Sequence, residues 1–323
     1  MDSYHRGEIA VQDRAGLTRQ AGSAGRALKD SIPEVAAAFL AGQPMLVLGG
    51  TDRAGRVWAT QLTGEPGFLT TPDPRTLRVG ALPLPEDPLA GVLLGTGVGE
   101  APAPARVGAI AIEPATRRRM RINGRSVQDG AGLRIDLDQV VSNCPKYLQT
   151  RDYRLLPADD PRTDLTAGNR RSVTDSTSLS PAQQQALRSA DTFFIATASD
   201  QGDADASHRG GNPGFVEVLS PTRLRWPDYL GNSMFLTLGN LEINPAAGIL
   251  LPGWETGSTL HLTGAARTVW DAAEIARVPG AQRLVEFEIA AVREIMATSR
   301  LRWSQPGYSR FNPPVAGRPS DRP

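Results

Sequence analysis

Short stretches in which apolar and polar residues alternate recur along the chain and predict a mainly β protein. In residues 133–138 (LRIDLD) and 259–264 (TLHLTG) every second residue is apolar, which is typical of strands with one buried face. Continuous apolar runs bounded by Gly, Pro or Asp indicate further strands at 45–50, 109–114, 193–198 and 248–253. Short helices are expected after Pro33 and Pro181, where apolar positions recur at helical spacing. Many short strands with few helices favour small antiparallel barrels.

The same order of elements occurs twice. When Gly55 is set on Gly202, Pro66-Gly67-Phe68 falls on Pro213-Gly214-Phe215. Further segments match in the same order: 32–48 with 180–196, 73–79 with 220–226, 118–126 with 258–266, and 133–140 with 285–292. The period is far longer than that of a solenoid repeat, so we expect a duplicated domain. The predicted organisation is a first copy at 1–156, a polar linker at 157–180, and a second copy at 181–323 with an irregular tail.

Composition is that of an ordinary globular chain of 323 residues, long enough for two cores. The formal net charge of +1 gives no reason to expect nucleic acid as a partner. No apolar run is long enough for a membrane span, and residues 1–16 do not look like a signal peptide. A single cysteine excludes an intrachain disulfide, and we expect a cytoplasmic protein.

Several common sites are excluded by spacing. The three histidines form no zinc motif, so no metal site is expected. The glycine-rich segment 95–100 runs into APAPA, where no helix can follow, so it is not a dinucleotide-binding turn. No nucleophile elbow and no Walker loop occur.

The remaining candidate chemistry lies in the second copy. The stretch ASHRGG places His208 and Arg209 beside a hairpin turn, and a helix is predicted to start near Asn232 or Ser233. Asn or Ser at that position is also an ordinary helix cap, which leaves a purely structural role open. A helix N-terminus nonetheless presents free N–H groups to an anion, and a nearby His–Arg pair could complete a phosphate site.

Here the sequence resembles a known family. Residues 191–271 are similar to the pyridoxamine 5′-phosphate oxidase-like, FMN-binding split barrels, through ASHRG, LRWPDY, GNS, INPAAGILL and TLHLTGAAR in family order. The resemblance implies two tandem split β-barrel domains with short flanking helices, joined as an intramolecular pseudo-dimer that holds FMN between the copies. The implied FMN-binding residues are Ser207, His208, Arg209, Gly210, Tyr229, Asn232, Ser233, Thr259 and His261 from the second copy, and Arg119, Arg121 and Lys146 reaching across from the first.

Two departures affect what the resemblance implies. Asn232 and Ser233 stand where the family usually has Arg-Lys, so deazaflavin F420 or haem is an alternative cofactor. The family's C-terminal substrate-binding element is not evident, so pyridoxamine phosphate is not the expected substrate. The first copy has Thr60, Gln61 and Leu62 where the second has Ser207, His208 and Arg209, so we expect one cofactor per chain.

The expected function is FMN-dependent oxidoreduction of a small organic substrate, with NAD(P)H as a candidate electron donor. His208 is the candidate catalytic proton donor, because histidine ordinarily titrates near neutrality. The alternatives are an F420-dependent reductase on the same fold and a non-catalytic flavin or haem binder. Cys144 is either an inert buried thiol or, beside Lys146, a reactive one. The chain is expected to act as a monomeric pseudo-dimer or as a homodimer.

Overall fold

The computed structural model describes residues 4–95, 103–142, 145–157, 160 and 172–315. The helices in these ranges are α1 (Arg6–Arg14), α2 (Thr18–Gly25), α3 (Glu34–Ala41), α4 (Ala90–Leu93), the 3₁₀ turn η1 (Pro114–Thr116), α5 (Pro181–Ser189), α6 (Leu236–Ile243) and α7 (Ala272–Ile275). The strands are β1 (Met45–Thr51), β2 (Val57–Thr63), β3 (Leu69–Asp73), β4 (Thr76–Val79), β5 (Ala105–Glu113), β6 (Arg118–Asp129), β7 (Gly132–Ser142), β8 (Tyr153–Leu155), β9 (Val173–Ser176), β10 (Thr192–Ala198), β11 (Ala204–Gly210), β12 (Glu217–Ser220), β13 (Arg223–Tyr229), β14 (Ala246–Pro252), β15 (Thr259–Val269), β16 (Ala281–Ile295) and β17 (Leu301–Trp303).

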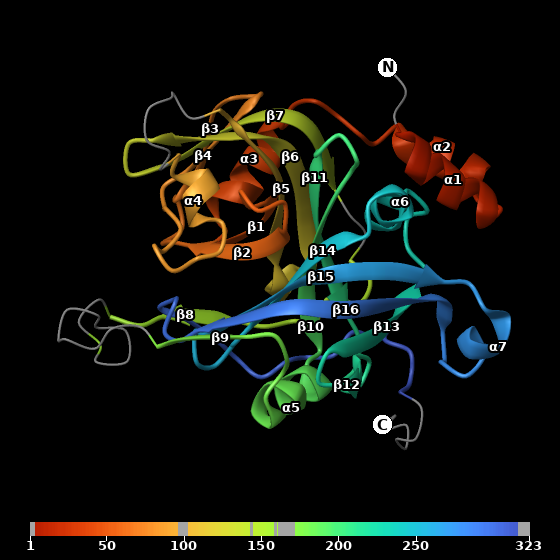
Figure 1. Ribbon diagram of the computed structural model, residues 1–323. Coiled ribbons are helices and arrows are strands. Elements are labelled where there is room, and N and C mark those ends of the chain that lie inside the picture. Colours follow the sequence, from red (N-terminus) through yellow and green to blue (C-terminus); the bar gives the residue numbers. More distant parts are fainter. Residues whose placement is uncertain (1–3, 96–102, 143–144, 158–159, 161–171, 316–323) are drawn as a thin grey trace.

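The protein is mainly β and contains two large antiparallel sheets with the same strand order (Figure 1). The first sheet runs β2-β1-β5-β6-β7-β4-β3, and the second runs β11-β10-β14-β15-β16-β13-β12, with β9 added beside β16. Each strand of the first sheet therefore has a counterpart at the same place in the second. Within the described ranges neither path of strands closes on itself, as in a split barrel. The expected fold class, a mainly β split-barrel protein, is confirmed.

The pairing register follows the sequence alignment for β2 and β11, whereas the match of 32–48 with 180–196, which sets Leu48 on Ala196, is off by one residue in β1 and β10. Leu48 pairs with Thr60 in the first sheet, and Ile195 pairs with Ser207 in the second. The long hairpins β6–β7 and β15–β16 each change register at a glycine, Gly124 or Gly264. A Cβ on either glycine would lie 2.2 or 1.9 Å from a carbonyl oxygen of the opposite strand, so both bulges require a residue without a side chain.

The two halves share a core where β1, β2 and β5 face β10, β11 and β14. Met45, Val47 and Ile110 pack there with Phe194 and Leu250, all nearly inaccessible to solvent. Gly49 and Gly108 allow the closest approach, since a Cβ on either would lie within 2.6 Å of an atom of the second half. This packing places β6 of the first half beside β11 of the second.

Some chain segments lie outside the boundaries expected from the sequence. The predicted linker contains β9, which pairs with the end of β16. Helix α1 packs against α6 of the second half, as Figure 1 shows, and Val11 joins the core of the second sheet. The predicted domain boundaries themselves stay a prediction. No helix in the described ranges is both long enough and apolar enough to cross a membrane.

Candidate functional site

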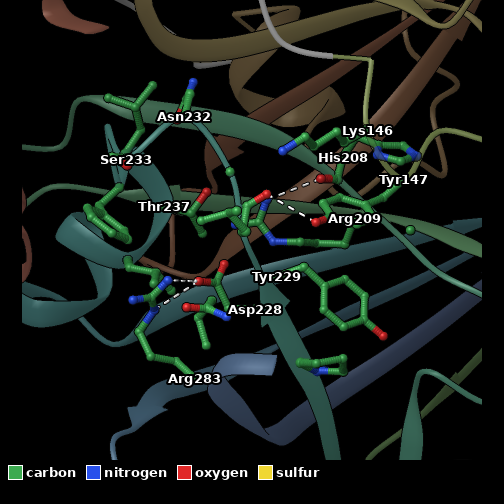
Figure 2. A pocket seen from close by; sticks show the side chains of 18 of the residues that line it. Lys146, Tyr147, His208, Arg209, Asp228, Tyr229, Asn232, Ser233, Thr237 and Arg283 are labelled. Atoms are coloured by element: carbon green, nitrogen blue, oxygen red, sulfur yellow. Dashed lines mark hydrogen bonds and ion pairs between the residues drawn. The ribbon is translucent and has the colours of Figure 1, made fainter. Parts of the chain in front are cut away.

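A cavity of about 130 Å³ lies between the two halves. The second half supplies the end of β11, the end of β13 and the loop leading into α6. The first half supplies Arg119 and Arg121 from β6. It also supplies the turn with Lys146 and Tyr147 (Figure 2). The structure thus gathers in one place nine of the residues expected from the sequence: Arg119, Arg121, Lys146, His208, Arg209, Gly210, Tyr229, Asn232 and Ser233.

The loop before α6 has an unusual backbone. Ser233 and Phe235 both adopt the left-handed region, with φ of 64° and 61°, which is unfavourable for residues other than glycine. Asn232 Oδ1 accepts a hydrogen bond from the Met234 amide at 3.1 Å, and Gln12 of α1 donates to the Met234 carbonyl at 3.1 Å. The helix begins at Leu236, so the prediction of a start near Asn232 or Ser233 was wrong by three to four residues. The left-handed residues delay the helix and leave a curved loop along the cavity.

Ser207 does not line the cavity but lies beneath it. Its hydroxyl is 2.7 Å from Thr237 Oγ1 and donates to Asp205 Oδ2 at 3.0 Å. Arg121 Nη1 reaches the same carboxylate at 3.4 Å. Asp205 therefore joins β11, α6 and the first-half strand β6 under the floor of the site.

The cations around the cavity differ in their partners. Arg283 forms an ion pair with Asp228 at 2.8 Å, two residues that face each other in the β13–β16 register. Arg119 Nη1 lies 2.9 Å from His208 Nδ1. Arg209 donates to the His208 carbonyl at 3.1 Å, and Lys146 Nζ lies 5.9 Å from the centre of the Phe311 ring. A surplus of positive charge therefore lines the cavity, which suits an anionic ligand.

Burial and these charges shift several pKa values. Burial, followed by the nearby Arg119, Arg209 and Arg121, holds the pKa of His208 well below its ordinary value. Histidine at this position is therefore neutral at pH 7, contrary to the expectation that it titrates near neutrality. Burial also lowers the pKa of Arg209, and Arg121 adds to that effect. Burial raises the pKa of Tyr229, so its phenol stays protonated.

Tyr147 closes the cavity from the first half. It adopts a left-handed backbone, its hydroxyl donates to the Leu230 carbonyl at 3.1 Å, and its ring centroid lies 5.0 Å from that of Tyr229. Gly210 makes this approach possible, because a Cβ there would lie 2.1 Å from the Tyr147 carbonyl oxygen. Gly210 thus shapes the site through its missing side chain.

Thr259 and His261 were expected at this site, but the structure places them elsewhere. His261 Nδ1 lies 2.9 Å from the Ala59 carbonyl of β2, and its Nε2 lies 2.8 Å from Thr259 Oγ1. The alignment that matches Arg119 with Thr259 and Arg121 with His261 explains the error. Arg119 and Arg121 reach the second half's cleft, so by pseudo-symmetry their counterparts reach the first half's.

Other lining residues had little or no signal in the sequence. Asp228 lies within the LRWPDY segment but was not singled out, and Arg283 comes from a strand with no recognisable motif. Tyr147 and Leu17 are brought to the cavity only by the tertiary fold. Cys144 falls outside the described residues. Within those residues no group of three or more His, Cys, Asp or Glu side chains could hold a metal ion.

Comparisons with known proteins agree with this picture of the second half. Residues 179–299 match the family model of pyridoxamine 5′-phosphate oxidase. No curated protein matches the sequence.

Solved structures with similar folds each cover somewhat more than a third of this chain. A candidate pyridoxamine 5′-phosphate oxidase from Lactobacillus delbrueckii is 15% identical, with a TM-score of 0.31, over 36% of this chain and 94% of its own. An FAD-binding protein from Mycobacterium smegmatis is 18% identical, with a TM-score of 0.27, over 38% and 98%. A pyridoxamine 5′-phosphate oxidase-related, FMN-binding protein from Nostoc punctiforme is 15% identical, with a TM-score of 0.27, over 36% and 85%. Residues 179–299, within the second half, are thus similar to the pyridoxamine 5′-phosphate oxidase family.

Proposed function

We propose that the protein is an FMN-dependent oxidoreductase that acts on a small organic substrate. The observation that carries the proposal is the cationic cavity between the halves, lined by Arg119, Arg121, Lys146 and Arg209, within reach of the family-matched segment. A phosphate monoester is a dianion that cationic side chains bind with charge-assisted hydrogen bonds. The residues present therefore suit a phosphorylated flavin.

The chain's own contribution is binding and orientation. Arg209 and the loop at Asn232 and Ser233 would hold the phosphate, and Arg119 and Lys146 would approach the ligand from the other half. Tyr147 and Tyr229 provide an aromatic wall that limits access of water. The bound flavin supplies the electron transfer chemistry. No residue of the described site is a required acid or base in this proposal.

The proposal includes the cellular setting. We place the protein in the cytoplasm, supported by one cysteine in 323 residues, and NAD(P)H is the proposed electron donor. The proposed functional unit is the single chain, in which the two halves replace the two subunits of a dimer, or a homodimer of such chains.

The decisive experiment measures which cofactor binds to the full-length protein freed of ligand. FMN, riboflavin, F420 and haemin are titrated separately, with thermal unfolding as a second readout. FMN should bind and raise the unfolding temperature, and riboflavin, which lacks the phosphate, should bind at least tenfold more weakly. Binding of F420 or haemin in preference to FMN would overturn the cofactor assignment. Oxidation of NADH or NADPH by the FMN-loaded protein then separates an enzyme from a flavin carrier.

A further inference from the structure

The contact between His208 and Arg119 joins the two halves and fixes the proton on the histidine. Arg119 Nη1 lies 2.9 Å from His208 Nδ1. A guanidinium group has only donors, so Nδ1 must accept this hydrogen bond. In a neutral imidazole one nitrogen carries the proton, and here that nitrogen is Nε2.

The donor so created has no acceptor within the described part of the chain. His208 is 4% exposed, and its Nε2 is buried without a hydrogen-bond partner. The ring lies edge-on to Phe194, with centroids 5.8 Å apart, and a Cβ on Gly210 would come within 2.8 Å of its Cε1. The ring is therefore held in place by packing. A buried donor without an acceptor costs free energy that a ligand acceptor can recover.

The charged groups around the ring favour its neutral form. The arginines that face His208 come from two strands, Arg119 and Arg121 from β6 and Arg209 from β11. Together with burial they keep the pKa of the ring well below its ordinary value. A neutral ring with a fixed tautomer can donate one hydrogen bond, but it cannot supply protons at neutral pH.

We propose that His208 is a specificity-determining residue that donates its Nε2–H to an acceptor atom of the ligand, and that Arg119 is the positioning residue that fixes this tautomer. The acceptor is a carbonyl oxygen or an unprotonated ring nitrogen, as the flavin ring system carries. The identity of that acceptor rests on the proposed function, whereas the tautomer is a property of the free protein. This role replaces that of proton donor expected from the sequence.

The chain contains its own control for the tautomer. His261 Nδ1 lies 2.9 Å from the Ala59 carbonyl, which can only accept, so the proton of a neutral His261 is on Nδ1. Long-range ¹H–¹⁵N correlation spectra of the free, full-length protein labelled at histidine distinguish the two tautomers. The spectra should show Nε2–H for His208 and Nδ1–H for His261, with each residue assigned by its His→Gln variant.

Three variants of the first half test the role of Arg119. Arg119→Met should turn the His208 signal into a mixture of tautomers, and Arg119→Lys should restore part of the Nε2–H form. Arg121→Met removes the same charge nearby but no contact to Nδ1, and it should leave the tautomer unchanged. An Nδ1–H or charged His208 in the wild type, or an Arg119→Met spectrum identical to the wild type, overturns the assignment.

Ligand binding tests the remaining step. His208→Phe should weaken FMN binding about tenfold. His208→Gln keeps a hydrogen-bond donor, so its loss of binding free energy should be less than half of that caused by His208→Phe. The ratio between wild type and His208→Phe should stay constant from about pH 7 to pH 9, since the lowered pKa keeps the ring neutral in this range. An unchanged affinity in His208→Phe overturns the ligand contact. If the wild type itself binds no FMN, the proposed function fails, and the spectra of the free protein still decide the tautomer.

Discussion

Replacing Arg209 by Met tests whether the positive charge of the cavity serves ligand binding. Methionine keeps most of the aliphatic stem and removes the charge. In the free protein Arg209 donates to the His208 carbonyl at 3.1 Å and forms no ion pair within the described residues. Burial and Arg121 lower its pKa, and Arg209 in turn lowers that of His208. The structure therefore predicts opposite effects of Arg209→Met on stability and on binding.

The free energy of unfolding of the free protein should stay the same or increase, because burial of the Arg209 charge and its repulsion by Arg121 together outweigh its attraction to Asp228 and Asp205. Binding of FMN should weaken, because a charge-assisted hydrogen bond contributes about 1.5–3 kcal/mol. This corresponds to an increase in the dissociation constant of roughly 10- to 150-fold. The affinity for riboflavin, which has no phosphate, should fall much less in Arg209→Met.

The assay combines thermal unfolding of the free protein with quenching of FMN fluorescence. Arg106→Met is the matched control, since Arg106 is an exposed arginine that pairs with Asp203 away from the cavity. The control should leave FMN affinity unchanged and should alter stability by about 1 kcal/mol or less. An Arg209→Met protein that binds FMN like the wild type would refute the assignment of Arg209. A large loss of stability without ligand would show that Arg209 is a structural residue.

Three further predictions concern the surroundings of the site. Burial raises the pKa of Glu8 to about 8, so between about pH 4.5 and pH 8 the folded protein binds more protons than the unfolded protein. The stability of the protein should therefore fall as the pH rises through this window. Glu8→Gln should flatten the decline of the unfolding temperature with pH. In Gly7→Ala the new Cβ would lie 2.2 Å from the Gly239 carbonyl oxygen, which should lower stability by about 1–3 kcal/mol and weaken FMN binding. The control Gly22→Ala has open space around the new Cβ and should be neutral or slightly stabilising in the same unfolding and titration assays. Titration of FMN against protein concentration should saturate at one per chain, and saturation at two would contradict the asymmetry of the two clefts.

Repetition in the sequence carried most of the information about the fold. Apart from 32–48, which was matched one residue out of register with 180–196, the matched strand segments fall at the same register positions in the two sheets, and even the bulges at Gly124 and Gly264 correspond. Such matches are visible because each strand needs the same alternation of side chains and the same turns in both copies. The strand β9 was missed, because its residues VTDS are exposed and lack an apolar pattern.

The candidate site could be predicted only where a local motif existed. His208, Arg209 and the loop at Asn232 lie in recognisable segments, and Arg119 followed from the pseudo-symmetry. Arg283 lies opposite Asp228 in the β13–β16 pairing, and no local sequence pattern predicts that pairing. The delayed start of α6 depends on the left-handed backbone of Ser233 and Phe235, which tertiary contacts hold in place. Helix propensity, a local property, cannot predict such contacts.

The asymmetry between the two clefts follows from what each half offers the other. Toward the second half's loop, β6 of the first half presents Arg119 and Arg121. Toward the first half, β15 presents Thr259 and His261 at the matched positions. In the first half itself, Thr60 donates to the buried carboxylate of Asp87. Burial raises the pKa of Asp87, and His261 partly opposes this shift. An anionic ligand would meet two arginines at the cavity, whereas the matched place in the first half holds a buried acid. Two different halves within a single chain permit this difference, because two identical subunits would have to carry the same residues at both places.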